Sequence, residues 1–415
     1  HAVPVIVDAY KKGIVDFDGE KAYEAMLHAA DQTHLGLASY HKNGFITAND
    51  EPESISKTLE YAYDDWCIAQ MAKDLGKEGD YIKFMERAQS YKNVFDPNTG
   101  FMRAKMNHSW FVPFDPSEVN YNYTEANSWQ YSFYVPQDIK GFTQYLGGKD
   151  KLEAKLDELF TASSETAGRH QADITGLIGQ YAHGNEPSHH MAYLYNYVNK
   201  PWKSQSRVSQ ILKEMYSNAP DGLSGNEDCG QMSSWYVLSA MGIYPVTPGL
   251  DYYTIGCPRL EKASINLENG NQFQIIANGA SEEFKYIQSA SLNGKAFNRS
   301  YIYHSEIMEG GTLEFIMTNT PNKSWATADT EIPVSMIEDA VIVAVPYIDQ
   351  GDRTFTDSNK LALKAWDTEA KIYYTIDGSK ANINSTLYSD AFTITESMTL
   401  KAIAVKGTVS SKQIT

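Results

Sequence analysis

Cysteine is scarce in this chain, and its scarcity excludes a disulfide framework. The 415 residues contain three cysteines, Cys67, Cys229 and Cys257. Three cysteines cannot all pair within one chain, and their spacing matches no zinc-binding motif. We therefore expect neither a disulfide-stapled scaffold nor a structural zinc site.

Basic charge and long apolar runs are also lacking. The chain has 35 Lys and Arg residues against 52 Asp and Glu residues, a formal net charge of -17. Such an excess of acid repels a polyanion, so we expect no nucleic-acid partner. No apolar run reaches the length of a membrane-spanning helix, so we expect no membrane span. There is neither a glycine-rich phosphate loop nor a Gly-x-Ser-x-Gly elbow.

The composition that is present is that of a globular protein rich in tyrosine. Apolar residues make up 42% and charged residues 21%, and the length suits two or three domains. The 28 tyrosines each combine a flat apolar face with a hydroxyl, which suits sugar rings, although a tyrosine-rich core explains them equally well. Helix-like sequence starts close to His1, which is not Met, so we expect a fragment or a processed chain.

The hydrophobic pattern changes along the chain and predicts three parts. Residues 1–247 show helical periodicity with no fixed repeat, which indicates an α/α toroid rather than a solenoid array. Residues 248–330 alternate like strands and predict a β-sandwich, and residues 331–415 predict a separate Ig-like all-β module. The predicted helices cover residues 18–27, 54–75, 80–94, 127–135, 137–146, 150–160, 173–181, 187–199, 204–216 and 229–241.

A first polar cluster surrounds Glu125. The carboxyl group stands in the sequence among Tyr121, Tyr123, Trp129 and Tyr131. Apolar surroundings raise the pKa of a carboxyl group, which is what a general acid needs. The alternative is a charge that merely stabilises a helix N-terminus.

A second cluster runs from His183 to His190. Its Asn185 and Glu186 supply oxygen ligands, which suit Ca²⁺ better than a transition metal. A zinc site would need two histidines on one helix face, and the adjacent His189 and His190 point in different directions. The alternative is a helix cap, with Pro187 at the first helical position, followed by two partly buried histidines.

A third cluster, at residues 224–248, holds a second carboxylate. Asn226, Glu227 and Asp228 precede a predicted helix that Gly242 should end. Glycoside hydrolysis uses two carboxyl groups, one that protonates the leaving oxygen and one that activates water or attacks. In an α/α toroid the loops of different helix pairs meet at one end, so Glu125 and Asp228 could face one cleft there. The alternative is a capped core helix with a solvated acidic loop.

Four segments together resemble glycoside hydrolase family 92. They are residues 1–10, 123–131, 184–190 and 225–236, and the resemblance extends over residues 1 to about 325. It implies a Ca²⁺-dependent, inverting, exo-acting α-mannosidase, mostly bacterial, with an (α/α)₆ domain. The family's N-terminal β-sandwich and the start of that domain would be missing here, so a longer parent protein or a second chain should cover that face. Residues 373–379 resemble the C-terminal domain of chitobiase-type β-hexosaminidases.

The resemblance also implies roles for single residues. Glu125 matches the general acid and Asp228 the general base, whereas Asn226 stands where some members carry Asp and takes no proton-transfer role. Asn185 and Glu186 match the loop that shapes the sugar and calcium sites. The full set of predicted binding residues is Trp129, Glu186, His189 and Gln231 for substrate and Asn185 and Asn226 for Ca²⁺.

These inferences predict an enzyme that removes terminal mannose from high-mannose N-glycans, with α-1,2 or related linkages. The bacterial family implies a secreted, periplasmic or cell-surface location. Two other functions remain open: a non-catalytic carbohydrate-binding protein and another toroidal glycosidase that acts on glucosides. The paired carboxyl groups favour an enzyme over a binding protein, and the combined motifs favour mannose over glucose.

Overall fold

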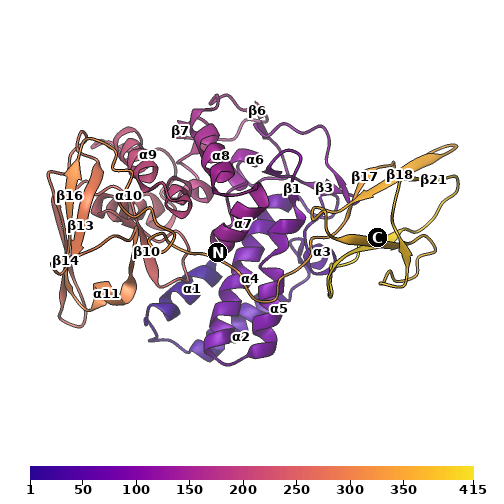
Figure 1. The fold of residues 1–415 in the computed structure, drawn as a ribbon, viewed down its shortest axis with the longest axis horizontal. Coiled ribbons are helices and arrows are strands. Elements are labelled where there is room, and N and C mark those ends of the chain that lie inside the picture. The colour runs from indigo at the N-terminus through magenta and orange to yellow at the C-terminus, as the bar shows by residue number, and fades with distance from the viewer.

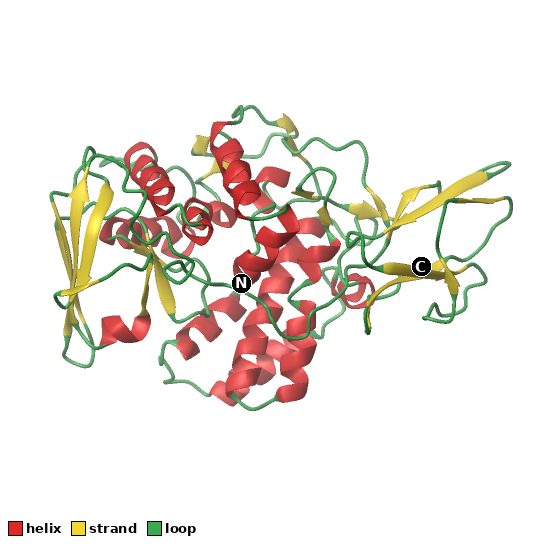
Figure 2. Ribbon diagram, viewed as in Figure 1, coloured by secondary structure: helices red, strands yellow, loops and turns green.

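Helices occupy the middle of the molecule, and strands occupy both ends. The computed structural model describes residues 1–415. Figure 1 shows a central helical body with a sheet region on either side, and Figure 2 shows the same division by element type. The predicted fold class is thereby confirmed: part of an α/α toroid, then a β-sandwich, then a small all-β domain. None of the helices combines the length and apolar character needed to cross a bilayer.

The helical body is organised around one long buried helix, α4 (Ser54–Asp74). Its apolar side chains point in most directions, as expected of a core helix. It packs against α1, α2 and α5. The other α-helices are α1 (Ala2–Lys11), α2 (Gly19–Ala30), α3 (Leu37–Asn43), α5 (Glu78–Arg87), α6 (Ser128–Tyr131), α7 (Ile139–Leu146), α8 (Lys149–Thr161), α9 (Pro201–Glu214), α10 (Gln231–Met241) and α11 (His304–Met308). The 3₁₀ helices are η1 (Ser90–Asn93), η2 (Pro136–Asp138), η3 (Glu186–Ser188), η4 (Met191–Val198) and η5 (Asp228–Gly230).

The predicted helix at 173–181 is wrong. Gly176 and Gly179 there have φ of 62° and 61°, which a right-handed helix does not allow. The segment forms the hairpin β7 (Leu177–Ile178) and β8 (Tyr181–Ala182). The helix predicted at 127–135 shortens to α6, and that at 187–199 is 3₁₀ rather than α.

Two sheets form the β-sandwich and enclose one apolar core. One sheet has the order β11-β12-β16-β13-β14 and the other the order β15-β10-β9. Their strands are β9 (Ile243–Tyr244), β10 (Tyr252–Ile255), β11 (Lys262–Asn266), β12 (Gln272–Asn278), β13 (Tyr286–Leu292), β14 (Lys295–Ala296), β15 (Tyr301–Tyr303) and β16 (Gly311–Thr318). The core between them includes Phe273 and Phe315. Strand β9 lies before the predicted boundary at residue 248.

The C-terminal module shares a sheet with the helical body. Strand β17 (Tyr347–Gln350) pairs in parallel with β4 (Ser109–Trp110) of the helical part. Trp366 also stacks on Tyr145 of α7 with ring centres 3.6 Å apart. The resulting sheet has the order β21-β18-β17-β4-β3, and the module's other sheet has the order β20-β19-β22-β23. These strands are β3 (Lys105–Met106), β18 (Asn359–Lys364), β19 (Lys371–Thr375), β20 (Thr386–Leu387), β21 (Phe392–Ile394), β22 (Lys401–Lys406) and β23 (Val409–Ser410).

Two short pairs complete the strands of the helical body. One is the hairpin of β1 (Phe95–Asp96) with β2 (Phe101–Met102). The other joins β5 (Glu118–Val119) in parallel with β6 (Ala167–Gly168). The second pair matters for function, because β5 leads into the loop of Glu125 and β6 leads toward Asp173.

Candidate active site

Glu125 lies on a loop that is held in place from both sides. The backbone N–H of Thr124 donates to Ser56 Oγ of α4 at 2.8 Å. After Glu125, Asn127 caps α6: its side chain accepts from the N–H of Gln130, whose own side chain accepts from the N–H of Asn127. Glu125 itself is half-buried and has φ of 51°, a left-handed conformation that few residues other than glycine adopt. The loop therefore fixes the position of this carboxyl group.

The second predicted cluster contacts the first directly. Asn185 is buried, and its Nδ2 donates to the backbone carbonyl of Glu125 at 3.2 Å. The sequence allowed Asn185 to cap the following helix, but its side chain forms no capping bond to η3. Glu186 beside it is exposed. Asn185 thus ties two loops together and leaves Glu186 free to meet a ligand.

The histidines of this second cluster are structural. His189 Nε2 lies 2.9 Å from the carbonyl of His183, and His190 Nε2 lies 2.8 Å from the carbonyl of Phe133. Burial lowers the pKa of His189 and of His190 to about 4, so both are neutral near pH 7. His189 is 5% exposed and its carbonyl accepts from Trp235 Nε1, so the residue predicted to contact substrate lies in the core.

The third cluster forms an exposed loop in front of α10. Asn226 Nδ2 donates to Asp173 Oδ1 at 3.0 Å, and Gln231 Nε2 donates to the carbonyl of Asn226 at 3.0 Å. Glu227 turns back to accept from the N–H and hydroxyl of Ser233 at 3.2 and 3.1 Å. Asp228 is exposed, and its carboxyl group forms no hydrogen bond within the chain. Of the acids in this loop, Asp228 is therefore the one left free for chemistry.

Two glycines bring the second and third loops into backbone contact. A Cβ atom on Gly225 would lie 2.7 Å from Cα of Gly184, and one on Gly184 would lie 2.6 Å from the carbonyl oxygen of Ser224. Neither position has room for a side chain. The Asn185 bond and this glycine contact together join the loops of Glu125, Glu186 and Asp228 into one region.

The charges of this region act on Glu125. Burial raises the pKa of Glu125, and the negative charges of Asp173 and Glu186 raise it further, with smaller contributions from Glu53 and Asp228. A carboxyl group with a raised pKa keeps its proton longer as pH rises, which suits a general acid. The contribution of Asp228 means that the two predicted catalytic groups share one electrostatic environment.

The sequence analysis did not identify Asp173. It lies between β6 and β7 and accepts hydrogen bonds from Gln171 and from Asn226. Its sequence context, an aspartate two residues before Thr175-Gly176, is ordinary turn chemistry and carries no signal of a site. Its importance follows from the fold, which places its charge beside Glu125.

Trp129 lies in the core and not on an open surface. It is 5% exposed, its ring lies edge-to-face against Phe101 at 4.6 Å, and Lys155 Nζ lies 4.3 Å from the ring centre. Contact with a sugar needs a free ring face. These contacts give Trp129 a packing role beneath the Glu125 loop.

The loops offer neutral oxygen atoms, rather than a cluster of acids, as ligands for the predicted Ca²⁺ ion. No group of three or more histidine, cysteine or acidic side chains is placed to hold a metal ion. Two oxygen atoms beside the site, Gln231 Oε1 and Ser188 Oγ, are nevertheless buried without a hydrogen-bond partner. Asn185 and Asn226 use their amide nitrogens in the bonds described above, which leaves their oxygens available. Neutral oxygen donors of this kind fit Ca²⁺, which takes six to eight oxygens including waters.

Helix α4 adds further acids to the same region. Glu60 accepts from Tyr131 at 3.0 Å and lies 2.8 Å from His1 Nε2. Hydrogen bonding and charge from Glu60 raise the pKa of His1, to which Glu186 also contributes. Burial raises the pKa of Asp64 to about 8, with help from Asp65 and Glu60. No sequence pattern marks these α4 acids, because the spacing of residues 54–75 is that of an ordinary amphipathic helix.

The family follows from comparison with known proteins. The family model described as "Glycosyl hydrolase family 92 catalytic domain" matches residues 1–319. The chain belongs to glycosyl hydrolase family 92. A second model, described as "Chitobiase/beta-hexosaminidase C-terminal domain", matches residues 349–415. Both resemblances seen in the sequence are confirmed.

Solved structures and a curated relative agree with this assignment. The family GH92 alpha-mannosidase BT3965 of Bacteroides thetaiotaomicron is 43% identical with a TM-score of 0.76, over 81% of this chain and 45% of that one. The inverting mannosidase BT2199 of the same species is 37% identical with a TM-score of 0.74, over 80% of this chain and 48% of that one. An uncharacterized secreted glycosidase of Arthroderma benhamiae is 31% identical over 80% of this chain and 46% of its own. The chain therefore spans about half the length of each of these three proteins.

Proposed function

We propose that this chain carries the acid and the base of an exo-acting, inverting, Ca²⁺-dependent α-mannosidase. The substrate would be the terminal mannose of high-mannose N-glycans, joined by α-1,2 or related linkages. One observation carries the proposal: Glu125, with its raised pKa, shares a charge environment with Asp228 on loops that converge in a family 92 domain. The mannosidase activity of BT3965 and BT2199, as their names give it, supports mannose as the sugar.

In this proposal Glu125 protonates the glycosidic oxygen as the bond to the leaving sugar breaks. Its half-buried position and the surrounding carboxylates raise the pKa of Glu125, which favours the protonated form that a general acid needs. The hydrogen bond from Asn185 to its backbone carbonyl holds the loop while the proton moves. The leaving sugar takes the proton, and Glu125 becomes a carboxylate.

Asp228 would act on the opposite side of the sugar ring. It is exposed and free of internal bonds, so it can accept a proton from a water molecule that attacks the anomeric carbon. The anomeric configuration inverts because water enters on the face opposite to the leaving group. Gln231, which bonds to the loop of Asp228, and the exposed Glu186 are proposed to bind hydroxyl groups of the sugar.

The proposed calcium ion would be held by Asn185 and Asn226, together with substrate and water oxygens. When bound, Ca²⁺ would orient sugar hydroxyls and favour the planar ring of the transition state. The proposal predicts that a chelator abolishes hydrolysis and that Ca²⁺, but not Zn²⁺, restores it. Full activity after exhaustive chelation would remove the ion from the proposal.

The anomer that is released and the linkage that is cleaved test the proposed activity. Mannobioses of each linkage are incubated with the protein, and proton NMR follows the first anomer released. The proposal expects β-mannose first, from an α-linked substrate. Initial release of α-mannose, or cleavage of glucosides but not mannosides, would contradict it.

We further propose that the protein works outside the cytoplasm of a bacterium, by secretion or at the periplasm or cell surface. The secreted relative supports export, and the Bacteroides structures support a bacterial source. Fractionation of the source cells, with immunodetection of the protein, tests both statements.

A further inference from the structure

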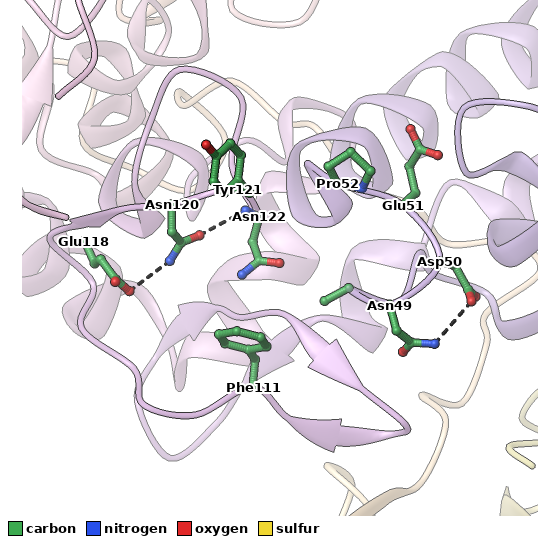
Figure 3. A pocket seen from close by; sticks show the side chains of 10 residues that line it. Asn49, Asp50, Glu51, Pro52, Phe111, Glu118, Asn120, Tyr121 and Asn122 are labelled. Carbon is green, nitrogen blue, oxygen red and sulfur yellow. Dashed lines mark hydrogen bonds between the residues drawn. The ribbon is translucent and has the colours of Figure 1, made fainter. Parts of the chain in front are cut away.

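A pocket of about 440 Å³ opens beside the loop of Glu125 and takes no part in the proposed chemistry. One wall is the segment 48–52 ahead of α4, and the other is formed by Phe111, Glu118 and residues 120–122. The volume lies in the range of pockets that bind small molecules. Figure 3 shows the ring of Phe111 on one side of the pocket, Asn120 and Asn122 above it, and the Asn49–Asp50 pair across from them.

Backbone bonds hold the two walls together, so the pocket is built into the fold. The N–H of Glu53 donates to the carbonyl of Tyr121 at 2.5 Å, and the N–H of Ile55 donates to that of Asn122 at 3.0 Å. Glu118 accepts from Asn120 Nδ2 at 3.0 Å, and Asn120 Oδ1 accepts from the N–H of Asn122 at 3.0 Å. A ligand would therefore meet a preformed shape, which lowers the entropic cost of binding.

The lining combines flat rings with hydroxyl-binding groups. Tyr121 is 70% exposed, and its hydroxyl forms no hydrogen bond within the chain. The guanidinium of Arg169 lies 4.5 Å from the centre of the Tyr121 ring and supports it. Amide and carboxylate side chains from Asn49, Asp50 and Asn120 surround the rings. A sugar unit matches this arrangement, because it presents an apolar face to a ring and hydroxyls to amides and carboxylates.

The acidic side chains of the pocket disfavour anionic ligands. Asp50, Glu51 and Glu118 repel an anion, and of these only Glu51 has a cationic partner, Lys57 at 2.5 Å. No group of acidic side chains is placed to hold a metal ion. The acids therefore disfavour an anion, and the rings and amides of the lining fit a hydroxyl-rich ligand.

The pocket adjoins the loop of Glu125. Asn122 precedes Glu125 by three residues, so their Cα atoms are at most about 11 Å apart. In the proposed function Glu125 protonates the oxygen that leaves with the rest of the glycan. The inner sugars of the glycan are attached to that oxygen, so the neighbouring pocket is within their reach.

We infer that this pocket is a sugar subsite that binds an inner unit of the glycan, beyond the sugar attached to the bond that breaks. The inference rests on the proposed function for its orientation, because the glycan enters with its terminal mannose at Glu125. The pocket walls, with Tyr121 and Asn120 as principal contacts, would then select glycan chains over single mannosides.

Two ligands separate this inference from the proposed function. Mannoimidazole, found in complex with BT3965, probes only the terminal-sugar site. A sulfur-linked mannotriose, which resists hydrolysis, probes that site and the subsite together. Calorimetric titration of the protein and of its Tyr121→Ala and Asn120→Ala variants measures both affinities. Tyr121→Phe keeps the ring, and Tyr373→Ala in the C-terminal module is the matched control.

If the pocket is this subsite, the affinity for mannotriose should fall about tenfold in Tyr121→Ala and by less in Asn120→Ala. It should change little in Tyr121→Phe or in Tyr373→Ala. Mannoimidazole should bind all of these equally. Mannotriose affinity that is unchanged in Tyr121→Ala, or no binding of mannotriose at all, overturns the subsite. If mannoimidazole fails to bind while mannotriose depends on Tyr121, the pocket stands as a sugar site and the proposed function fails.

Discussion

The two loops that hold the proposed acid and base are built in opposite ways. The loop of Glu125 is anchored by Ser56 and by Asn185, and its carboxyl group is half-buried. The loop of Asp228 is exposed, and the carboxyl group has no internal partner. Burial and neighbouring charge raise the pKa of Glu125 and favour its protonated form, whereas the carboxyl group of Asp228 is open to water. The difference shows how one site can give two carboxyl groups opposite tasks.

Replacing each carboxyl group should have the largest effect and should separate the two roles. Glu125→Gln and Asp228→Asn should each lower kcat by about 10²–10⁴-fold, because each removes a proton-transfer group. An aryl mannoside whose leaving group needs no proton should restore much of the Glu125→Gln rate. The same substrate should not help Asp228→Asn, which lacks the group that activates water. Steady-state rates on an aryl mannoside and a mannobiose measure this, and equal rescue of both variants would remove the distinction.

The glycine contact between the loops should come next. Gly184→Ala forces its new methyl group against the carbonyl of Ser224, so the loops must move apart. A displacement of about 1 Å at an active site can cost about 10²-fold in rate, and we expect a loss of that order in kcat/KM. Gly79→Ala is the control, because a Cβ there meets nothing within 4 Å. A Gly184→Ala protein that keeps its activity would show that the close approach is dispensable.

Removing the bond that joins the acid loop to its neighbour should have a smaller effect. Asn185→Ala deletes the donor to the carbonyl of Glu125, and a net hydrogen-bond contribution of about 1 kcal/mol predicts about a fivefold loss in kcat/KM. Because the change also removes a proposed Ca²⁺ ligand, the rates are compared at saturating Ca²⁺. Asn382→Ala, an exposed amide in the C-terminal module, is the matched control. Loss of thermal stability with unchanged kinetics would assign Asn185 to the fold alone.

The pH profile should show the smallest effect. Glu125 must carry its proton to act, so the rate should fall as pH rises through its raised pKa. Asp173→Asn removes a negative charge that favours the protonated form. The pKa of Glu125 should then drop, and the alkaline limb of kcat/KM should move to lower pH by less than about one unit. Asp221→Asn, an exposed acid outside this cluster, should leave the limb in place. A shift to higher pH in Asp173→Asn would contradict the assigned cause.

The sequence motifs identify the polar segments of the candidate site but not the contacts that bring these segments together. The segments around Glu125, Asn185 and Asp228 were identified from their residues and from the family resemblance. Their convergence depends on a glycine-to-glycine contact and on one hydrogen bond from the Asn185 side chain to a distant loop. No local sequence pattern predicts either contact. The helix predicted at 173–181 fails for a similar reason, because its apolar spacing conceals two left-handed glycines.

Burial was the second feature that local pattern could not supply. Trp129 and His189 have residue types that suit sugar binding, yet both are 5% exposed and pack in the core. An aromatic or imidazole side chain has the same sequence signal in either setting. The docking of the C-terminal module also depends on a distant partner, since Ile348 pairs with Ser109. Pairing over such a separation is set by tertiary packing.

The geometry of the two carboxyl groups around a bound sugar tests the account most directly. A crystal structure of the protein with mannoimidazole would show the position of each group. The account predicts Glu125 and Asp228 on opposite sides of the ring, with their carboxyl groups about 6.5–9.5 Å apart, as an inverting enzyme requires. Carboxyl groups about 5 Å apart, or side chains that face different surfaces of the domain, would contradict it.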